Sequence, residues 1–212
     1  AATALLLVAV PPLWAATRHV VTLVHEAGHA VVALATGRRL NGIRLHTDTS
    51  GLTVSSGRPR GPGMIATAGA GYLAPSALGL GALALVRAGH TAWALYAVLA
   101  VLAGMLVFIR NGWGLVVVGL SGVAAAALTY RAPESVQDFA AMTFAWVLLV
   151  AAPRTALDLW GHRRRVRSRT TDADVLARLT GVPAALWNLL FLVLTLGALA
   201  GGVELVDRFG VG

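Results

Sequence analysis

Long apolar runs separated by short polar connections make up most of the chain. A helix that crosses the hydrocarbon core of a bilayer needs about 20 apolar residues, and most of these runs approach or exceed that length. The pattern predicts seven membrane-spanning helices, over residues 1–16, 18–37, 63–87, 91–109, 113–129, 137–160 and 184–203.

The first of these runs is short for a span and contains Pro11 and Pro12 near its end. A secretory signal peptide is the alternative interpretation, but the run has neither a basic n-region nor a clear cleavage site. Because the sequence opens abruptly on Ala1, we expect a first span from which a few residues are missing.

Residues 40–61 form the longest stretch without a helical pattern. Apolar and polar residues alternate on both sides of the turn-like sequence Asp48-Thr49-Ser50-Gly51, which predicts a β-hairpin. Two roles are open for it. It is either a plain surface hairpin or an edge strand that pairs with an extended peptide substrate by β-augmentation.

Composition supports a membrane protein. Hydrophobic residues make up 57% of the 212, charged residues only 12%, and the mean hydropathy is +0.74, whereas an ordinary soluble domain is about 25% charged. We therefore expect an all-α integral membrane protein, with one polytopic domain over 1–212. This is a bundle of about six to seven transmembrane helices with one short β-hairpin. The absence of cysteine excludes disulfides and thiolate metal sites.

The 17 basic residues are all arginine, and their placement predicts the orientation of the chain. Twelve lie on the side where the helix over 18–37 ends and four on the opposite side, and such an excess marks the cytoplasmic face. The hairpin is then cytoplasmic, as is the basic loop over 161–170. That loop carries a cluster that we interpret as a topological anchor touching anionic lipid, not as a nucleic-acid site: Arg163, Arg164, Arg165, Arg167 and Arg169. The Ala-, Gly- and Arg-rich composition favours a bacterial plasma membrane.

The chemistry of the chain centres on His25-Glu26-Ala27-Gly28-His29, within the predicted helix over 18–37. Positions i and i+4 share a helix face, so both imidazoles can bind one metal ion. This is the H-E-x-x-H pattern, in which the two histidines hold zinc and the glutamate is a general base. Because ionisable groups in an apolar segment are costly unless they bind something, we favour a zinc site over a chance match.

Two histidines leave a catalytic zinc site one protein ligand short. Among the nine acidic residues, Asp158 is the one that lies in or at the end of a span and on the cytoplasmic half. We therefore expect His25, His29 and Asp158 as the metal ligands, with Asp158 on the third-ligand helix over 137–160. The alternative role for Asp158 is an ion pair with Arg154, four residues earlier. Asp172 is the rival ligand, although it is expected to cap a short polar helix over 171–180.

These residues resemble the site-2 protease family of intramembrane zinc metalloproteases. Members carry H-E-x-x-H on one helix, then a cytoplasmic-side hairpin, then an aspartate ligand in a motif like N-x-x-P-x-P-x-x-D-G. The stretch from Pro153 to Asp158 keeps the proline-to-aspartate spacing but lacks the asparagine, the second proline and the final glycine. The motif helix, the hairpin and the later Thr171-Asp172-Ala173-Asp174 look like the small M50B-like bacterial branch.

The resemblance implies an intramembrane zinc metalloendopeptidase that cuts the membrane-spanning segments of substrate proteins. Glu26 would be the base that takes a proton from a zinc-activated water. The alternative is a non-catalytic, metal-binding membrane scaffold or partner subunit. Glu26 favours the enzyme, because a scaffold needs metal ligands but no base.

Overall fold

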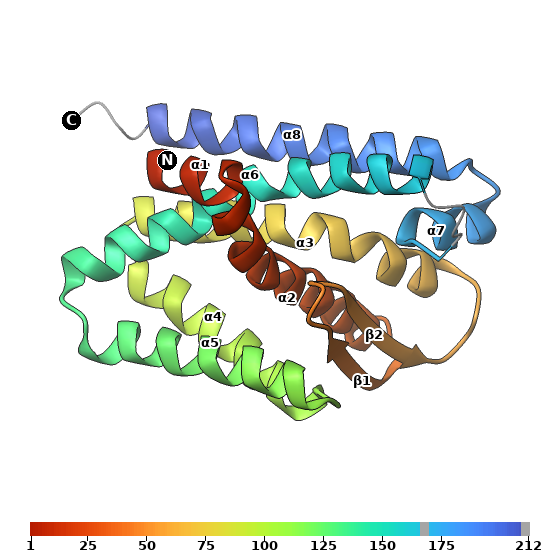
Figure 1. Cartoon of the computed structure of the whole chain (residues 1–212), viewed down its shortest axis with the longest axis horizontal. Coiled ribbons are helices and arrows are strands. Elements are labelled where there is room, and N and C mark those ends of the chain that lie inside the picture. Colours follow the sequence, from red (N-terminus) through yellow and green to blue (C-terminus); the bar gives the residue numbers. More distant parts are fainter. Residues whose placement is uncertain (166–169, 209–212) are drawn as a thin grey trace.

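The computed structural model describes residues 1–165 and 170–208, with side chains to residue 161 and from residue 170. The Arg163–Arg169 cluster of the basic loop thus lies outside the described side chains. Helices dominate, and a single β-hairpin interrupts them (Figure 1). The elements are α1 (Ala2–Ala9), α2 (Pro11–Ala35), β1 (Arg39–Leu45), β2 (Gly51–Ser56), α3 (Pro62–Arg87), α4 (Thr91–Phe108), α5 (Gly112–Arg131), α6 (Glu134–Arg165), α7 (Asp172–Thr180) and α8 (Ala184–Arg208).

The expected separate first span does not form. The eight residues of α1 are too few to cross a bilayer, and α2 already begins at Pro11. The two helices meet at an angle of 99°. Proline fixes its own φ and lacks an N–H group, so it suits the start of a helix and ends the one before it. The prolines therefore mark a corner, not the end of a span.

The remaining helices match the predicted polytopic architecture. Among the described residues, five helices are long and apolar enough to cross a membrane: α3, α4, α5, α6 and α8. The bent pair α1–α2 adds a sixth if it counts as one span. An even number of crossings returns the chain to the side where it began. Figure 1 accordingly shows α1 and the last turns of α8 at one end of the bundle, and the hairpin and α7 at the other.

The centre of the bundle is α3, which packs against α2, α6 and α8. Helix α6 runs without a break through Pro153. The pair α4 and α5 lies to one side and touches β1. Helix α7, which follows the basic loop, lies at the same end of the bundle as the hairpin (Figure 1).

The predicted hairpin is confirmed. Strands β1 and β2 pair antiparallel, with an irregularity between Leu40 and Gly42. The second edge of β1 meets the α4–α5 connection, where the backbone N–H of Arg110 donates to the carbonyl of Ile43 at 2.9 Å. The Asn111 side chain adds two bonds, accepting from the N–H of Leu45 at 3.2 Å and donating to its carbonyl at 2.6 Å. Within the described chain, no further strand pairs with the second edge of β2.

Candidate metal centre

The H-E-x-x-H side chains lie on the inner side of α2. His29 and Glu26 are buried, and His25 is partly exposed to a cavity. The motif begins well after the proline corner at Pro11 and ends before the last residue of α2, Ala35, so it lies within regular helix. The i, i+4 spacing brings Nε2 of His25 to 3.1 Å from Nε2 of His29. The predicted common face for the two imidazoles is therefore present.

The carboxylate that joins the two histidines belongs to Asp172. Its Oδ2 lies 3.2 Å from Nε2 of His25 and 3.2 Å from Nε2 of His29. Among the described residues, these three form the one group of histidine and acidic side chains arranged closely enough to share a metal ion. The geometry thus differs from the expectation that Asp158 would complete the group.

Local capping explains why Asp172 is free to face the histidines. The N-cap of α7 is Thr171, whose hydroxyl accepts from the backbone N–H of Asp174, while the Asp174 carboxylate accepts from the N–H of Thr171. This reciprocal capping box satisfies the helix terminus. Asp172 does not supply the expected cap, and as the first residue of α7 it lies against α2.

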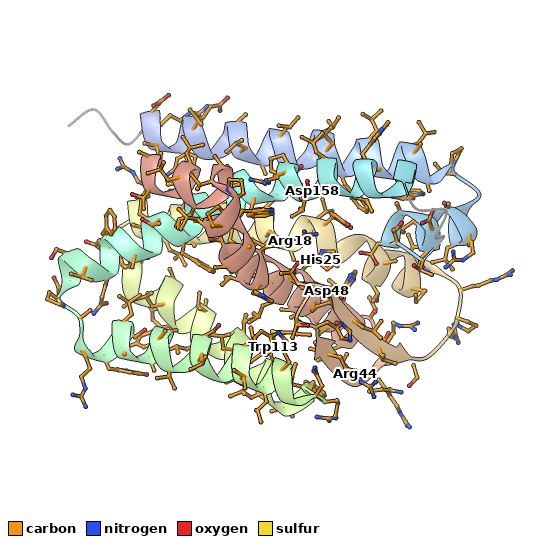
Figure 2. All side chains as sticks on the ribbon, in the orientation of Figure 1. Arg18, His25, Arg44, Asp48, Trp113 and Asp158 are labelled. Carbon is orange, nitrogen blue, oxygen red and sulfur yellow. The ribbon has the colours of Figure 1, made fainter. Side chains whose placement is uncertain are left out.

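Asp158 also lines the cavity, but it is not part of the group formed by the two histidines and Asp172. It is an exposed residue on α6, and Figure 2 shows it on a different helix from Arg18 and His25, which follow one another along α2. The ion pair between Arg154 and Asp158 that the i, i+4 spacing suggested is not among the ion pairs of the described residues. The Arg154 guanidinium donates to the carbonyl of Val8 and lies 4.5 Å from the ring centre of Trp14.

A second layer of contacts orients the histidines. Nδ1 of His29 lies 2.7 Å from the backbone oxygen of Thr67 in α3. Because a carbonyl only accepts, Nδ1 carries the proton and Nε2 keeps its lone pair for a metal. The backbone of α3 comes close at Gly71. There a Cβ would collide with Nε2 of His29 and would lie 2.6 Å from Nε2 of His25.

The ring of Tyr72 completes this wall. It meets His25 edge to face at 4.8 Å between ring centres and stacks on Phe191 of α8 at 5.0 Å. These contacts limit rotation of the His25 imidazole, because aromatic edges and faces pack with preferred geometries. The histidine pair is therefore held by α3 and α8 as well as by its own helix.

The Glu26 carboxylate points toward the hairpin. Oε2 accepts a hydrogen bond from the hydroxyl of Thr53 at 2.6 Å. Gly51 lies beside the same carboxylate, and a Cβ there would sit 2.5 Å from Oε1. Because Gly51 has no Cβ, strand β2 can lie closer to the Glu26 carboxylate than a residue with a side chain at position 51 would allow.

The two histidines, Glu26 and Asp172 border one cavity of about 510 Å³. Its walls come from α2, α3, α6, β2 and the start of α7. Besides the two histidines and Asp172 it exposes Arg18 and Tyr72, and residues Gly51–Thr53 of β2 form one side. A pocket with convergent polar groups inside an otherwise apolar bundle is the expected form of an active site.

The electrostatics of Asp172 suit a cation site. Burial opposes ionisation of the carboxyl, but the neighbouring His29 and His25 outweigh it and hold the pKa of Asp172 below its ordinary value. The group is therefore a carboxylate at neutral pH, which is the form that binds metals.

Several site residues were not predicted from the sequence: Thr53, Thr67, Gly71 and Tyr72. Gly71 belongs to a span, 63–87, that is rich in small residues, and small residues let membrane helices approach closely, so this composition is a signal for Gly71 as a place of close approach. Thr53 and Thr67 carry no distinctive pattern. Their roles depend on which segments the fold brings together.

Comparison with known proteins bears on the activity. The model of the family described as Peptidase M50B-like matches residues 1–202. The chain belongs to this family. No curated protein and no solved structure matches it significantly. This M50B-like chain is therefore a peptidase by family and a multi-pass membrane protein by its apolar helices, which confirms the resemblance inferred from the motif.

Proposed function

We propose that the chain is a zinc-dependent intramembrane endopeptidase, with His25, His29 and Asp172 as metal ligands and Glu26 as general base. One observation carries the proposal: three ligand atoms of the types that zinc prefers converge beside a glutamate in a polar cavity within the bundle. Asp172 takes the place that the sequence motif assigned to Asp158.

The residues fit zinc in number, chemistry and spacing. Ligand atoms about 2.0–2.1 Å from a tetrahedral ion lie about 3.3 Å from one another. The three separations here are 3.1, 3.2 and 3.2 Å. Three protein ligands leave the fourth position free, as in catalytic sites. A zinc ion bound there would lower the pKa of a water molecule and polarise a substrate carbonyl.

The side chains of the site have separate tasks. Glu26 accepts the proton of the attacking water and returns it to the leaving amine, as the same carboxylate can act first as base and then as acid. Thr67 keeps the His29 imidazole in one tautomer through its carbonyl. The surrounding helices exclude lipid and limit the number of competing water molecules.

Strand β2 supports the class of substrate. A helical segment must unwind before its peptide bond is accessible, and an extended peptide can pair with an unpaired strand edge. Residues of β2 border the cavity, while β1 already pairs with β2 and with the α4–α5 connection. We therefore assign to β2 the binding of an unwound membrane-spanning segment, in preference to a plain surface hairpin.

Orientation follows from the arginine distribution. The hairpin end of the bundle faces the cytoplasm, and the opposite end faces outward, in a bacterial plasma membrane. Single cysteines test this, because the native chain has none. Ser56→Cys, in β2, should react with an impermeant thiol reagent only from the cytoplasmic side. Gly89→Cys, in the α3–α4 connection, should react only from outside. The reverse pattern would invert the orientation.

The central test uses a reporter segment, a peptide of about 20 alanine and leucine residues with a central Gly-Gly and a fluorophore–quencher pair, reconstituted with the enzyme in phosphatidylcholine vesicles. Wild-type protein should cut it. Glu26→Gln should bind equimolar zinc but lose at least about 1,000-fold in rate, because general acid–base catalysis contributes about 100- to 10,000-fold. Equal cutting by both proteins would refute the role of Glu26. A zinc-loaded wild type that cuts no such segment would favour the alternative, a metal-binding scaffold.

A further inference from the structure

The hairpin makes its most direct contact with the catalytic machinery through one side chain. The Thr53 hydroxyl lies 2.6 Å from Oε2 of Glu26 and 3.2 Å from the backbone oxygen of the same residue. A hydroxyl has one proton to donate, and the carboxylate is the nearer and stronger acceptor. Thr53 is thus placed to fix the orientation of Glu26 from outside its own helix.

Thr53 is also a residue of β2, which borders the cavity and, among the described residues, pairs with another strand on one edge only. Side chains of a strand alternate between its two faces, while its backbone groups point along the edge. A peptide pairing with the edge of β2 opposite β1 would use the backbone of β2 and leave the Thr53 hydroxyl with Glu26. Substrate binding and base positioning would then share one short segment.

Other contacts hold that segment in place. The Thr22 hydroxyl of α2 donates to the carbonyl of Thr49 in the hairpin turn at 2.7 Å. Arg38 spans the base of the hairpin, donating to Ser55 Oγ at 3.1 Å and to the carbonyl of Arg58 at 2.6 Å. The α4–α5 connection fixes the far edge through Asn111. The position of Thr53 therefore does not depend on its bond to Glu26.

We infer that Thr53 is a positioning residue for catalysis: its hydroxyl holds the Glu26 carboxylate in the orientation that takes the proton, and couples that orientation to the strand that binds the substrate. This rests on the proposed peptidase function. Removing the hydroxyl would leave metal ligands and strand edge intact. The carboxylate would lose its fixed orientation, and the rate of the chemical step should fall more than substrate binding.

The variants are Thr53→Val, which keeps the shape without the hydroxyl, and Thr53→Ser, which restores the hydroxyl. Ser56→Ala is the matched control, because Ser56 is the last residue of β2 and lies outside the cavity lining that would hold the substrate, and its hydroxyl bonds Asn41 at 2.9 Å and not Glu26. All are full-length, zinc-loaded proteins in the vesicle assay with the reporter segment. Elemental analysis should find equimolar zinc in each.

Thr53→Val should lower kcat about 10- to 100-fold, the usual effect of losing a side chain that supports a site residue, with KM changed less than about twofold. Thr53→Ser should recover most of kcat, and Ser56→Ala should match wild type. A Thr53→Val protein with wild-type kcat would overturn the inference. So would a Thr53→Ser protein no better than Thr53→Val, since that would point to packing of the methyl group.

A second measurement reads the contact without catalysis. The chain has three glutamates, Glu26, Glu134 and Glu204, so carboxyl-¹³C-labelled glutamate gives three resolvable NMR signals, with Glu26 assigned by Glu26→Gln. Thr53→Val should shift the Glu26 signal alone, and Ser56→Ala should shift none. An unmoved Glu26 signal would refute the bond even if no substrate were ever cut. If Thr53→Val does not fold, Thr53→Ala compared with Thr53→Ser supplies the same two readouts.

Discussion

Two carboxylates reach the same cavity from different parts of the chain, and they differ in what holds them. Asp158 is an exposed residue within the long helix α6, and its direction is fixed by that helix. Asp172 opens α7, a nine-residue helix anchored by its own capping box. The shorter element places its carboxylate 3.2 Å from both histidines, and the longer one contributes only to the cavity wall.

The difference shows what a ligand position requires. A side chain on a spanning helix can reach a neighbour only at the depth and rotation that helix packing allows. A short helix such as α7 does not cross the membrane, so its cap and its packing against α3 and α8 can place its first residue beside the site. Under the proposed assignment of Asp172, the similarity of Pro153–Asp158 to a known motif is weaker information than the location of α7 in the fold.

The largest effect should separate the two carboxylates directly. Asp172→Ala should weaken zinc binding by more than about 100-fold and abolish cleavage, because even outer-shell changes cost about 10- to 100-fold in affinity. Asp158→Ala should keep equimolar zinc. Elemental analysis after dialysis against a weak chelator makes the measurement. Loss of zinc from Asp158→Ala, with zinc retained in Asp172→Ala, would restore the assignment made from the motif.

A smaller effect should come from the wall that supports the histidines. Gly71→Ala places a methyl group against both imidazoles, so the pair must separate and zinc affinity should fall about 10- to 100-fold. Gly69→Ala is the control on the same helix, since a Cβ there meets nothing within 4 Å. Titration with a competing zinc indicator measures both affinities. Equal affinities would show that α3 does not constrain the site.

The smallest effect should come from the cap that places Asp172. Thr171→Ala removes the N-cap hydroxyl, at a cost of about 1 kcal/mol to the helix terminus. That free energy corresponds to about a fivefold loss of zinc affinity if fraying of α7 is coupled to binding. Thr129→Ala removes a hydroxyl that bonds within α5, far from the cavity, and should leave affinity unchanged. An unaltered affinity in Thr171→Ala would mean that metal binding alone positions Asp172.

Much of the fold follows from local pattern. Apolar runs of sufficient length gave α3 to α6 and α8, and alternation around Asp48–Gly51 gave the hairpin, because both signals lie within one segment. The N-terminal run failed as a span because Pro11 starts a helix as readily as it ends one. The two prolines fit either the end of a span or a corner between two helices. The chain forms the corner, and there α1 packs against α6.

The candidate site divides in the same way. His25, Glu26 and His29 were predictable because a single helix turn brings them together. Asp172 was weighed and set aside, since aspartate at the start of a helix is a common cap. The T-x-x-D pattern of Thr171 and Asp174 is itself a capping-box signature, and it could have indicated that Asp172 is not needed as the cap. The contact of Thr53 with Glu26 joins residues 27 positions apart in sequence, and no local pattern encodes such a pairing.

The corner between α1 and α2 has a practical consequence for handling the protein. Arg154 lies within a membrane-spanning helix, and its guanidinium bonds the Val8 carbonyl and covers the Trp14 ring. A cation left in the bilayer interior costs about 2.5–3.5 kcal/mol by insertion scales. Displacing α1 would therefore uncover that charge on the surface of α6 that α1 covers. Designs for expression should keep α1 in place.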